Sequence, residues 1–409
     1  MTFPLRPITD EELPQLFHAL QDPFGFHSDG DDVEDFRLTT ELDRTLAAFD
    51  DEEMVGTAGA YSFELTVPGN LLVDAAGITI VTVSATHRRR GILRSMMERQ
   101  LDDVAERGET IAILTASEAS IYGRFGYGLA SQSSSWTLET DRATLARPST
   151  ATGRLRLVDA DRFLEAGPQV YDRRRREIPG AVNRVQAWWD VWQKDRPHTR
   201  GGQSARWYVL HEDDAGEVDG MLAYRRNRDA EHGLSRNVLT VDQLYGADDE
   251  VEAALWSFLL DHDLIHSVAA HGRPVDEPLR WRLADPRRLV TTDVVDDLWL
   301  RLVDVCGALS ARRYGTTDRL VVEVADPFRP HTAGRYLLDG GPDGAACTRT
   351  DADPDLTMDV ADLGALYLGG VTATALHRAG RIEEPTPGAV RRADVFFASS
   401  PPPWMTTGF

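Results

Sequence analysis

Residues 81–94 read Val-Thr-Val-Ser-Ala-Thr-His-Arg-Arg-Arg-Gly-Ile-Leu-Arg, and they join a predicted strand to a predicted helix. The strand, Gly77–Val83, is rich in the β-branched residues that favour extended backbone. In the helix that follows, apolar residues recur at steps of three and four, which gives it one apolar face. Those residues are Leu93, Met96, Met97, Leu101, Val104 and Ala105.

The basic loop between these two elements predicts a binding site for a diphosphate. The free N–H groups at the start of a helix point outward and carry partial positive charge, so the main chain itself can hold a phosphate there. A surface helix with a basic N-terminus is the alternative, but cations at that end oppose the helix dipole. We therefore favour the anion site, and we expect at least one of its three arginines to face solvent. The site comprises Arg88, Arg89, Arg90, Gly91, Ile92, Leu93 and Arg94.

The loop matches the Arg/Gln-x-x-Gly-x-Gly/Ala motif of the GNAT acyltransferases, except that Leu93 replaces the last small residue. Further along, Ala112–Glu118 predicts the next strand, and Ile-Tyr-Gly-Arg-Phe-Gly-Tyr-Gly at residues 121–128 predicts a short helix and a glycine turn. Together these segments closely resemble the enhanced intracellular survival (Eis) family of actinobacterial N-acetyltransferases, and a weaker resemblance covers all 409 residues. The resemblance implies acetyl-CoA as cosubstrate. It also implies an α/β (α+β) fold of two tandem GNAT-type domains followed by a sterol carrier protein type 2-like domain.

The chain is long enough for two or three domains, and we expect three. The first, residues 1–147, ends where Ala-Arg-Pro-Ser-Thr-Ala-Thr-Gly predicts a linker. The second, residues 148–293, repeats the order of strand (Val238–Tyr245) and helix (Val251–Leu260). Its connection, residues 246–250, is acidic and would repel a diphosphate, so we expect only the first domain to bind coenzyme A.

The third region, residues 294–409, alternates predicted strands and helices. We expect strands such as Arg319–Val324 and helices at Val294–Ala308 and Asp362–Leu368. By resemblance this is the sterol carrier protein type 2-like domain. We expect it to complete the acetyltransferase pocket and to supply the chain end, rather than to carry a lipid.

Composition narrows the class of protein. No stretch of about 18 apolar residues is present and the N-terminus has no apolar signal core, so we expect a cytoplasmic protein without a membrane span. The two cysteines, Cys306 and Cys347, have no metal-ligand spacing, and we expect free thiols and no metal. A net charge of −22 disfavours nucleic acid and mildly favours cationic substrates, although acidic surfaces are common for solubility alone.

Acetyl transfer to an amine needs a stabilised oxyanion and a path for the acyl donor. In this fold a backbone N–H on the strand before the phosphate loop stabilises the oxyanion, so Val81, Thr82 and Val83 are the candidates. Ser117 and Glu118 end the next strand, where we expect the sheet to admit the pantetheine arm. For Ser117 a role as helix N-cap is an equal alternative.

Tyr127 is the candidate general acid. Its phenol, with a reference pKa of about 10, can donate a proton to a thiolate of pKa about 8 to 9 as the carbon–sulfur bond breaks. A tyrosine in a glycine-rich turn is by itself most often a packing residue, but Eis enzymes carry their catalytic tyrosine at the matching place. Tyr122 is the competing candidate, and we expect it to pack against the coenzyme.

The chain end supplies the candidate general base. Residues 401–409 read Pro-Pro-Pro-Trp-Met-Thr-Thr-Gly-Phe, a stiff, apolar tail that would expose Trp404 and Phe409 unless it were docked. Docking would bring an α-carboxylate into the protein, where desolvation raises its reference pKa of about 3.3 to 3.7. The resemblance implies that the carboxylate of Phe409 is the base.

The acceptor site is harder to predict. Residues 24–36 combine aromatic side chains with Asp29, Asp31, Asp32, Glu34 and Asp35, and they could form a lid that holds a polyamine by ion pairs and cation–π contacts. An exposed, solvated loop is the alternative. Phe24, Phe26 and Phe36 are the lining candidates.

We expect direct acetyl transfer to cationic multi-amine acceptors, because no nucleophilic Ser or Cys motif is present. The resemblance implies aminoglycosides as acceptors and a homohexameric assembly. Two alternatives stay open: acetylation of lysine or N-terminal amines of proteins, and a protein that binds coenzyme A and an acyl lipid without turnover.

Overall fold

The computed structural model describes residues 3–27, 30–231 and 234–409, and it separates into two compact units. The first comprises Met1–Ser131, Asp296–Pro403 and Thr407–Phe409. The second comprises Gln132–Val295 and Trp404–Thr406.

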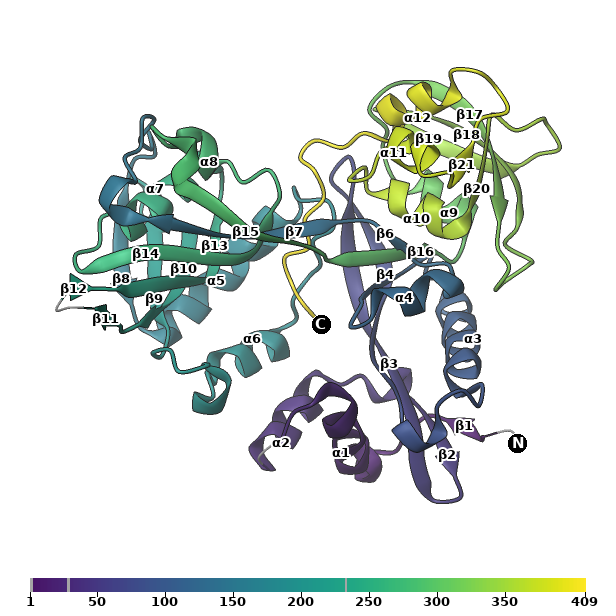
Figure 1. Ribbon diagram of the computed structural model, residues 1–409, viewed down its shortest axis with the longest axis horizontal. Coiled ribbons are helices and arrows are strands. Elements are labelled where there is room, and N and C mark those ends of the chain that lie inside the picture. The colour runs from purple at the N-terminus through teal and green to yellow at the C-terminus, as the bar shows by residue number, and fades with distance from the viewer. Residues whose placement is uncertain (1–2, 28–29, 232–233) are drawn as a thin grey trace. The chain divides into compact units, whose positions relative to one another are not determined.

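A seven-stranded sheet forms the N-terminal half of the first unit (Figure 1). Its order is β1-β2-β3-β4-β5-β16-β6. The strands β4 and β5 are parallel, whereas the pairs β3-β4, β5-β16 and β16-β6 are antiparallel. The strands are β1 (Leu5–Arg6), β2 (Leu46–Asp50), β3 (Glu53–Val67), β4 (Leu71–Val83), β5 (Ile111–Thr115), β6 (Gly128–Leu129) and β16 (Leu298–Leu302).

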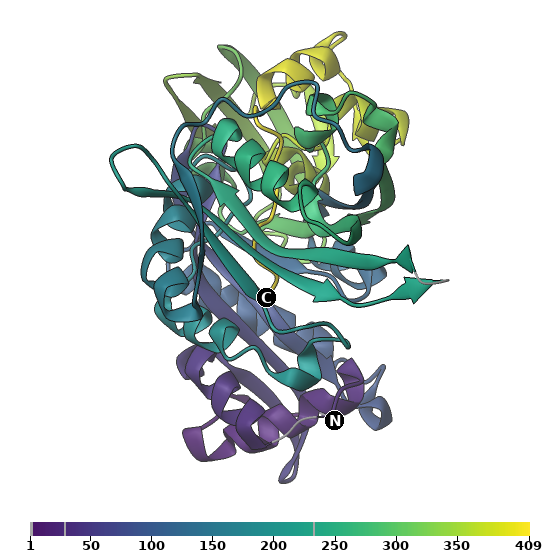
Figure 2. The same ribbon diagram turned by 90° about the vertical axis from the view of Figure 1, so that its left-hand side faces the viewer.

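Helices cover both faces of this sheet. Successive residues of a strand point to opposite faces, so Ala47 and Phe49 of β2 pack with α1 while Leu46 and Ala48 pack with α3. The purple N-terminal helices α1 and α2 lie beside one another in Figure 2. The helices are α1 (Leu13–Phe24), α2 (Gly30–Thr39), α3 (Ile92–Glu106) and the short α4 (Ala119–Tyr122), which continues into the 3-10 turn η4 (Gly123–Phe125).

The pairing between β4 and β5 is short. It covers only Ala75–Gly77 against Ile111–Ile113, although β4 continues to Val83 and β5 to Thr115. Beyond Gly77 the two strands are no longer hydrogen-bonded to each other. This opening at the carboxyl ends of two parallel strands is where the candidate site lies.

The second unit repeats this plan with a sheet of order β15-β7-β14-β13-β10-β9-β8, in which β13 and β14 are the parallel pair. Its strands are β7 (Gln132–Glu139), β8 (Arg154–Val158), β9 (Trp207–Glu212), β10 (Val218–Asn227), β13 (Asn237–Gly246), β14 (Ile265–Pro274) and β15 (Leu289–Asp296), with a small ribbon of β11 (Ala230–Glu231) and β12 (Leu234–Ser235). Its helices are α5 (Ala160–Arg175), α6 (Gln186–Gln193), α7 (Asp249–Leu260) and α8 (Leu279–Arg282).

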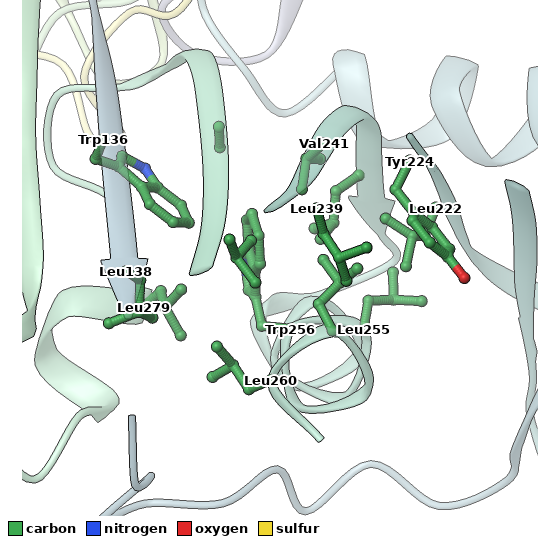
Figure 3. Close-up of a cluster of buried hydrophobic side chains, with 14 of the residues drawn as sticks. Trp136, Leu138, Leu222, Tyr224, Leu239, Val241, Leu255, Trp256, Leu260 and Leu279 are labelled. Atoms are coloured by element: carbon green, nitrogen blue, oxygen red, sulfur yellow. The ribbon is translucent and has the colours of Figure 1, made fainter. Parts of the chain in front are cut away.

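One core of the second unit lies between its sheet and α7. Figure 3 shows Trp136 of β7, Leu222 of β10 and Leu239 of β13 directed toward Leu255 and Trp256 of the helix. The rings of Trp136 and Trp256 are 5.1 Å apart, and both side chains are almost completely buried. Large apolar side chains on alternate strand positions and on one helix face account for this layer.

The C-terminal part of the first unit has a five-stranded sheet of order β19-β18-β17-β20-β21. Its strands are β17 (Asp318–Ala325), β18 (Gly334–Gly341), β19 (Gly344–Arg349), β20 (Leu356–Asp359) and β21 (Ile382–Glu383). Its helices are α9 (Val305–Ser310), α10 (Val360–Tyr367), α11 (Ala373–Arg378) and α12 (Ala389–Phe397). Cys306 and Cys347 both lie in this part and are free thiols.

The prediction of a helix at Val294–Ala308 is wrong for most of that range. The structure has strands β15 and β16 there, and only α9 is helical. Residues 298–302 alternate as Leu-Trp-Leu-Arg-Leu, and residues 290–295 are mostly β-branched, so the period of two and the strand propensity prevail. The predicted strands and helices at 77–83, 93–105, 112–118, 238–245, 251–260, 319–324 and 362–368 overlap observed elements of the same kind.

Each of the two seven-stranded sheets contains a strand from the part of the chain that forms mainly the other sheet. β7 follows the first half in sequence but lies between β14 and β15, whereas β16 follows the second half but lies between β5 and β6. The first compact unit therefore breaks at Ser131 rather than at the linker expected near residue 147. The linker composition marks a loop, but it carries no information on which sheet the preceding strand joins.

The C-terminal tail leaves α12 as an extended segment, drawn in yellow in Figure 1. Within the second unit, Trp404 is buried, its backbone N–H donates to the Pro179 carbonyl at 2.8 Å, and its indole N–H donates to the Gly272 carbonyl at 2.7 Å. Thr406 also lies in that unit, with its hydroxyl 2.7 Å from the hydroxyl of Tyr171. The tail is therefore docked and not frayed.

The glycine turn before β6 packs tightly on the C-terminal part of the first unit. A Cβ placed on Gly128 would lie 1.8 Å from the carbonyl oxygen of Ala361 and 2.6 Å from the nitrogen of Ala365. Arg301 of β16 is completely buried, donates to the carbonyl of Phe125 and pairs with Asp326. The turn is held by backbone-to-backbone contact and by a buried cation.

Replacement of Gly128 by alanine should lower the free energy of unfolding of the first unit by about 3 kcal/mol, because neither backbone can yield to the new methyl group. Gly123→Ala is the matched control in the same turn, since a Cβ there meets no atom within 4 Å. Urea unfolding followed by tryptophan fluorescence measures both. Equal stability of the two variants would contradict this view of the turn.

Candidate active site

A cavity of about 660 Å³ lies in the opening between β4 and β5. The end of β4, the basic loop, the first turn of α3 and the segment after β5 line it, with Pro23 and Phe24 at the end of α1. Among its lining residues are Val81, Thr82, Val83, Arg88, Arg89, Gly91, Ile92, Leu93, Arg94, Ser117 and Glu118. Eleven of the twelve residues predicted for the coenzyme are thus brought together in one cavity.

The basic loop is shaped by two residues in the left-handed region, Arg89 with φ of 63° and Gly91 with φ of 86°. Gly91 is the N-cap of α3; it supplies no side-chain cap, and the first turn of α3 contains no acidic residue. The N–H groups of that turn are therefore open toward the cavity side of the helix start. Such an end is suited to an anion.

Arg90 is the exception among the predicted residues, because it does not line the cavity. Its guanidinium lies over the ring of Phe3 at 4.5 Å and within 3.9 Å of the Asp50 carboxylate. The Asp50 carboxylate also lies 2.9 Å from Nε2 of His87. The positive φ at Arg89 turns successive side chains of the loop to different sides, so Arg88 and Arg89 alone of the three arginines line the cavity.

The matching helix of the second unit starts differently. Asp248 caps α7 by accepting hydrogen bonds from the N–H groups of Glu250 and Val251, each at 2.9 Å. Asp249 and Glu250 follow in the first turn. This carboxylate occupies the donors that a phosphate would need, and its neighbours add negative charge.

A smaller cavity of about 240 Å³ adjoins the first, since the two share Phe24, Val81, Ser117 and Tyr122 in their lining. Thr115, Ala116, Ile78, Thr79, Ile80 and Phe409 complete it. The end of the chain and the last residues of β4 thus face one cavity. This is where an acyl donor held in the first cavity could meet an acceptor.

Phe409 is fixed there by three residues of the first unit. The Thr115 hydroxyl donates to a terminal oxygen of Phe409 at 3.0 Å, and the Phe409 ring packs edge-on against Phe63 with centroids 4.9 Å apart. Gly77 has no side chain and so leaves space for both rings. A Cβ on it would lie 2.4 Å from the Phe63 ring and 3.2 Å from that of Phe409. The terminal carboxylate is positioned by packing and by a hydrogen bond.

β4 carries a bulge where it enters the cavities. Thr57 pairs with Thr82 and Gly59 with Thr79, so β4 has one residue more than β3 in this stretch. Ile80 has φ of 48°, a left-handed conformation that a β-branched residue adopts only at a cost of about 1 to 3 kcal/mol. Bulges beside active sites re-aim backbone groups, and this one lies directly before Val81.

Tyr127 and Tyr122 differ in their access to the cavities. Tyr122 lines both of them, and burial, together with the nearby Glu118, raises the pKa of its phenol. Tyr127 lies behind it in an edge-on contact, with ring centroids 6.1 Å apart, and does not line either cavity. Its hydroxyl is completely buried and has no hydrogen-bond partner among the described residues.

Burial also sets the electrostatics of Tyr127. It raises the pKa of the phenol far above its ordinary value, and the cations of Arg301 and Arg329 oppose part of that rise. The hydroxyl therefore keeps its proton throughout the physiological range. A buried donor without a partner costs about 1 to 3 kcal/mol, so its retention needs an explanation.

Ser117 and Glu118 lie at the end of β5, as expected. Glu118, rather than Ser117, occupies the N-cap position of α4, and it makes no side-chain cap there. Ser117 lines both cavities. The capping alternative for Ser117 is thus excluded, since Glu118 occupies the N-cap position.

The predicted aromatic lid is mostly a packed helix pair. Phe26 and Phe36 lie against Phe17 with centroid distances of 5.7 Å and 5.1 Å, and neither lines a cavity. Phe24 alone faces both cavities. The helical spacing of this stretch packs a partly buried Phe36 against α1, a packing that aromatic content alone does not reveal.

The acidic residues of this stretch do not gather at the cavities. Glu34 lies 3.6 Å from Arg37, and Asp35 is buried. Asp29 falls outside the described residues. Among the residues that are described, no group of three or more His, Cys, Asp and Glu side chains could hold a metal ion, and no helix is long and apolar enough to cross a membrane.

Sequence reasoning missed several lining residues: Pro23, His87, Ile121, Arg124 and Phe125. Arg124 and Phe125 belong to the same glycine-rich string as Tyr127, so that string was the available signal. Pro23 comes from a helix distant in sequence, and no local pattern marks it.

Comparison with known proteins agrees with this architecture. Residues 4–130 and 180–302 each match an acetyltransferase (GNAT) domain, and residues 305–406 match a sterol carrier protein domain. An uncharacterized N-acetyltransferase of Streptomyces coelicolor is 42% identical over the whole of both chains. N-acetyltransferase Eis of Mycobacterium bovis is 32% identical over 98% of each chain.

Among solved structures, Eis1 from Mycobacterium abscessus superposes with a TM-score of 0.88 and 37% identity, covering 99% of this chain and 100% of that one. The family, the two acetyltransferase domains and the sterol carrier domain expected from the sequence are thus confirmed. The chain belongs to the Eis-type N-acetyltransferases and is an acetyltransferase enzyme.

Proposed function

We propose that this enzyme transfers an acetyl group directly from acetyl-CoA to amines of cationic multi-amine acceptors such as aminoglycosides. The observation that carries the proposal is the meeting of three features at two adjoining cavities. These are the uncapped N-terminus of α3, the bulged end of β4 and the terminal carboxylate of Phe409.

The first cavity fits the coenzyme by its donor set. The open N–H groups of α3, with Arg88 and Arg89, suit a diphosphate, and the slot between β4 and β5 suits an extended pantetheine arm. When bound, acetyl-CoA supplies the acetyl group as a thioester. The extended backbone of Val81–Val83 can donate an N–H to the developing oxyanion.

Tyr127 serves as the general acid in this proposal. Its hydroxyl is buried, keeps its proton and has no hydrogen-bond partner among the described residues, and a sulfur that gains negative charge would provide an acceptor. Such a bond forms only as the carbon–sulfur bond breaks, so it stabilises the transition state and not the resting enzyme. Tyr122, which faces the cavities, packs against the coenzyme.

Phe409 serves as the general base. An acceptor ammonium beside the terminal carboxylate is attracted to it and can give up a proton to it, which leaves the neutral amine that attacks the thioester. The ring of Phe409 packs against Phe63 and the carboxylate is held by Thr115, so the base has a fixed position. Fixed placement of reacting groups is a large part of rate enhancement.

The acceptor class rests on charge and on family membership. A net charge of −22 attracts polycations, and Phe24 offers an aromatic face at both cavities. We also propose that the enzyme acts in the cytoplasm as a homohexamer and that its second GNAT-type domain binds no coenzyme. The carboxylate cap of Asp248 on α7 supports that last point.

The direct test is to mix the untagged protein with acetyl-CoA and tobramycin, and to follow free thiol and product mass together. We expect mass gains of one or more acetyl units, matched by equal amounts of thiol. Bound coenzyme without thiol release, for tobramycin and for lysine peptides alike, would refute the enzymatic proposal. Release only with peptides would replace the acceptor class.

Tyr127→Phe should lower kcat about 100-fold while the dissociation constant of acetyl-CoA stays unchanged, because only the proton donor is lost. Tyr122→Phe is the matched control, since it removes the other hydroxyl of the ring pair. Steady-state kinetics with calorimetric titration of the coenzyme measure both variants. A large loss of kcat in Tyr122→Phe, with Tyr127→Phe close to wild type, would move the acid role to Tyr122.

Addition of one glycine after Phe409 should lower kcat at least 10-fold, because the carboxylate moves away from the site while the Phe409 ring can stay packed. Amidation of the added residue tests whether a displaced carboxylate retains part of the function. Turnover is measured at saturating acetyl-CoA. Wild-type kcat in the extended chain would remove the terminal base from the mechanism.

A further inference from the structure

The bulge in β4 is held from the neighbouring strand by a threonine. The Thr57 hydroxyl of β3 donates to the carbonyl oxygen of Ile80 at 2.7 Å, and the Thr82 hydroxyl lies 2.7 Å from the same Thr57 oxygen. Thr57 is completely buried and Thr82 nearly so. The Thr57 hydroxyl therefore holds both Ile80, the residue with positive φ, and Thr82, two residues further along β4.

The direction of these hydrogen bonds is fixed by the count of protons. A threonine hydroxyl has one proton, and Thr57 gives it to the Ile80 carbonyl, so the proton between Thr57 and Thr82 must come from Thr82. The chain runs Thr82 to Thr57 to Ile80. Thr57 is completely buried, and in such a setting successive hydrogen bonds strengthen each other.

Gly59, on the same strand, leaves space for the Ile80 side chain. A Cβ on Gly59 would lie 2.8 Å from Cδ1 and 2.9 Å from Cγ1 of Ile80. β3 therefore offers a hydroxyl at position 57 and an empty place at position 59, and the bulged residue of β4 fits between them. Ile80 and Val81 then line the smaller cavity together with Phe409.

We propose that Thr57 is a positioning residue for acetyl transfer: it locks the β4 bulge so that the backbone N–H at Val81 or Thr82 faces the reacting carbonyl. This inference rests on the proposed function. Thr57 does not line either cavity, so it acts only through β4. Displacement of an oxyanion donor by a fraction of an ångström is costly, because its benefit depends on a preset geometry.

The test compares Thr57→Val, which keeps the shape and removes the hydroxyl, with Thr57→Ser, which keeps the hydroxyl. Thr57→Val should lower kcat at least 10-fold with the dissociation constant of acetyl-CoA within about twofold of wild type. Thr57→Ser should restore kcat to near the wild-type value. Thr82→Val breaks only the outer bond, and we expect kcat to fall about fivefold.

A second measurement distinguishes a local effect of Thr57 on the β4 bulge from a loss of stability of the whole unit. Amide hydrogen exchange of the segment 78–83 should become faster in Thr57→Val and not in Thr57→Ser, while exchange in α3 stays the same. If Thr57→Val is not recovered folded, Thr82→Val carries the same comparison of kcat and exchange.

Wild-type kcat in Thr57→Val, or equal losses of kcat in Thr57→Val and Thr57→Ser, would overturn the inference. So would a loss of kcat that is matched by an equal loss of coenzyme binding. Absence of thiol release by the wild-type chain with every amine would instead overturn the proposed function, which the variants do not address.

Discussion

The site depends on the parting of β4 and β5 beyond Gly77. Three residue pairs join these parallel strands, and after them the hydrogen-bond ladder stops while β4 runs on to Val83. A sheet that loses its ladder must satisfy its backbone groups in another way. Here the opening exposes the end of β4 to a cavity, places the start of α3 beside it, and leaves room for the chain end. Gly77, at the branch point, is small enough for Phe63 and Phe409 to pack over it.

The two sheets share one plan and differ at the start of the helix that joins their parallel strands. Each contains a parallel pair connected by a helix, α3 between β4 and β5 and α7 between β13 and β14, with the same strand order. In the first sheet, the N-cap Gly91 has no side chain and leaves the N–H groups at the start of α3 open. In the second, the Asp248 carboxylate accepts hydrogen bonds from two N–H groups at the start of α7, and acidic residues follow in the first turn. The C-terminal part of the first unit supports the site in two ways. Its backbone packs against the turn around Tyr127 and its Asp326 pairs with Arg301, which donates to the Phe125 carbonyl of that turn; it also leads the chain toward Phe409.

Sequence reasoning succeeded where the determinants are local. The β-branched run, the glycine and arginines of the loop and the apolar face of α3 lie within thirty residues and fix one another, so the strand, loop and helix followed directly. It failed where partners are distant. Arg90 turns to Phe3 and Asp50, Phe36 packs on Phe17, and residues 294–302 extend two sheets instead of forming a helix. Phe409 lies between these cases: the composition of the tail predicted docking, but family resemblance was needed to give its carboxylate a role. The positive φ of Ile80 had no sequence signal at all, since glycine would be the expected residue there.

Hydrogen exchange measured with and without acetyl-CoA, on the full wild-type chain, tests the central claim most directly. We expect protection of the segments 81–94 and 115–122, which line the opening between β4 and β5, and no change at residues 246–252, the corresponding turn of the second unit. Protection at residues 246–252, or none at 81–94, would contradict the claim that the parted strands of the first sheet form the one coenzyme site.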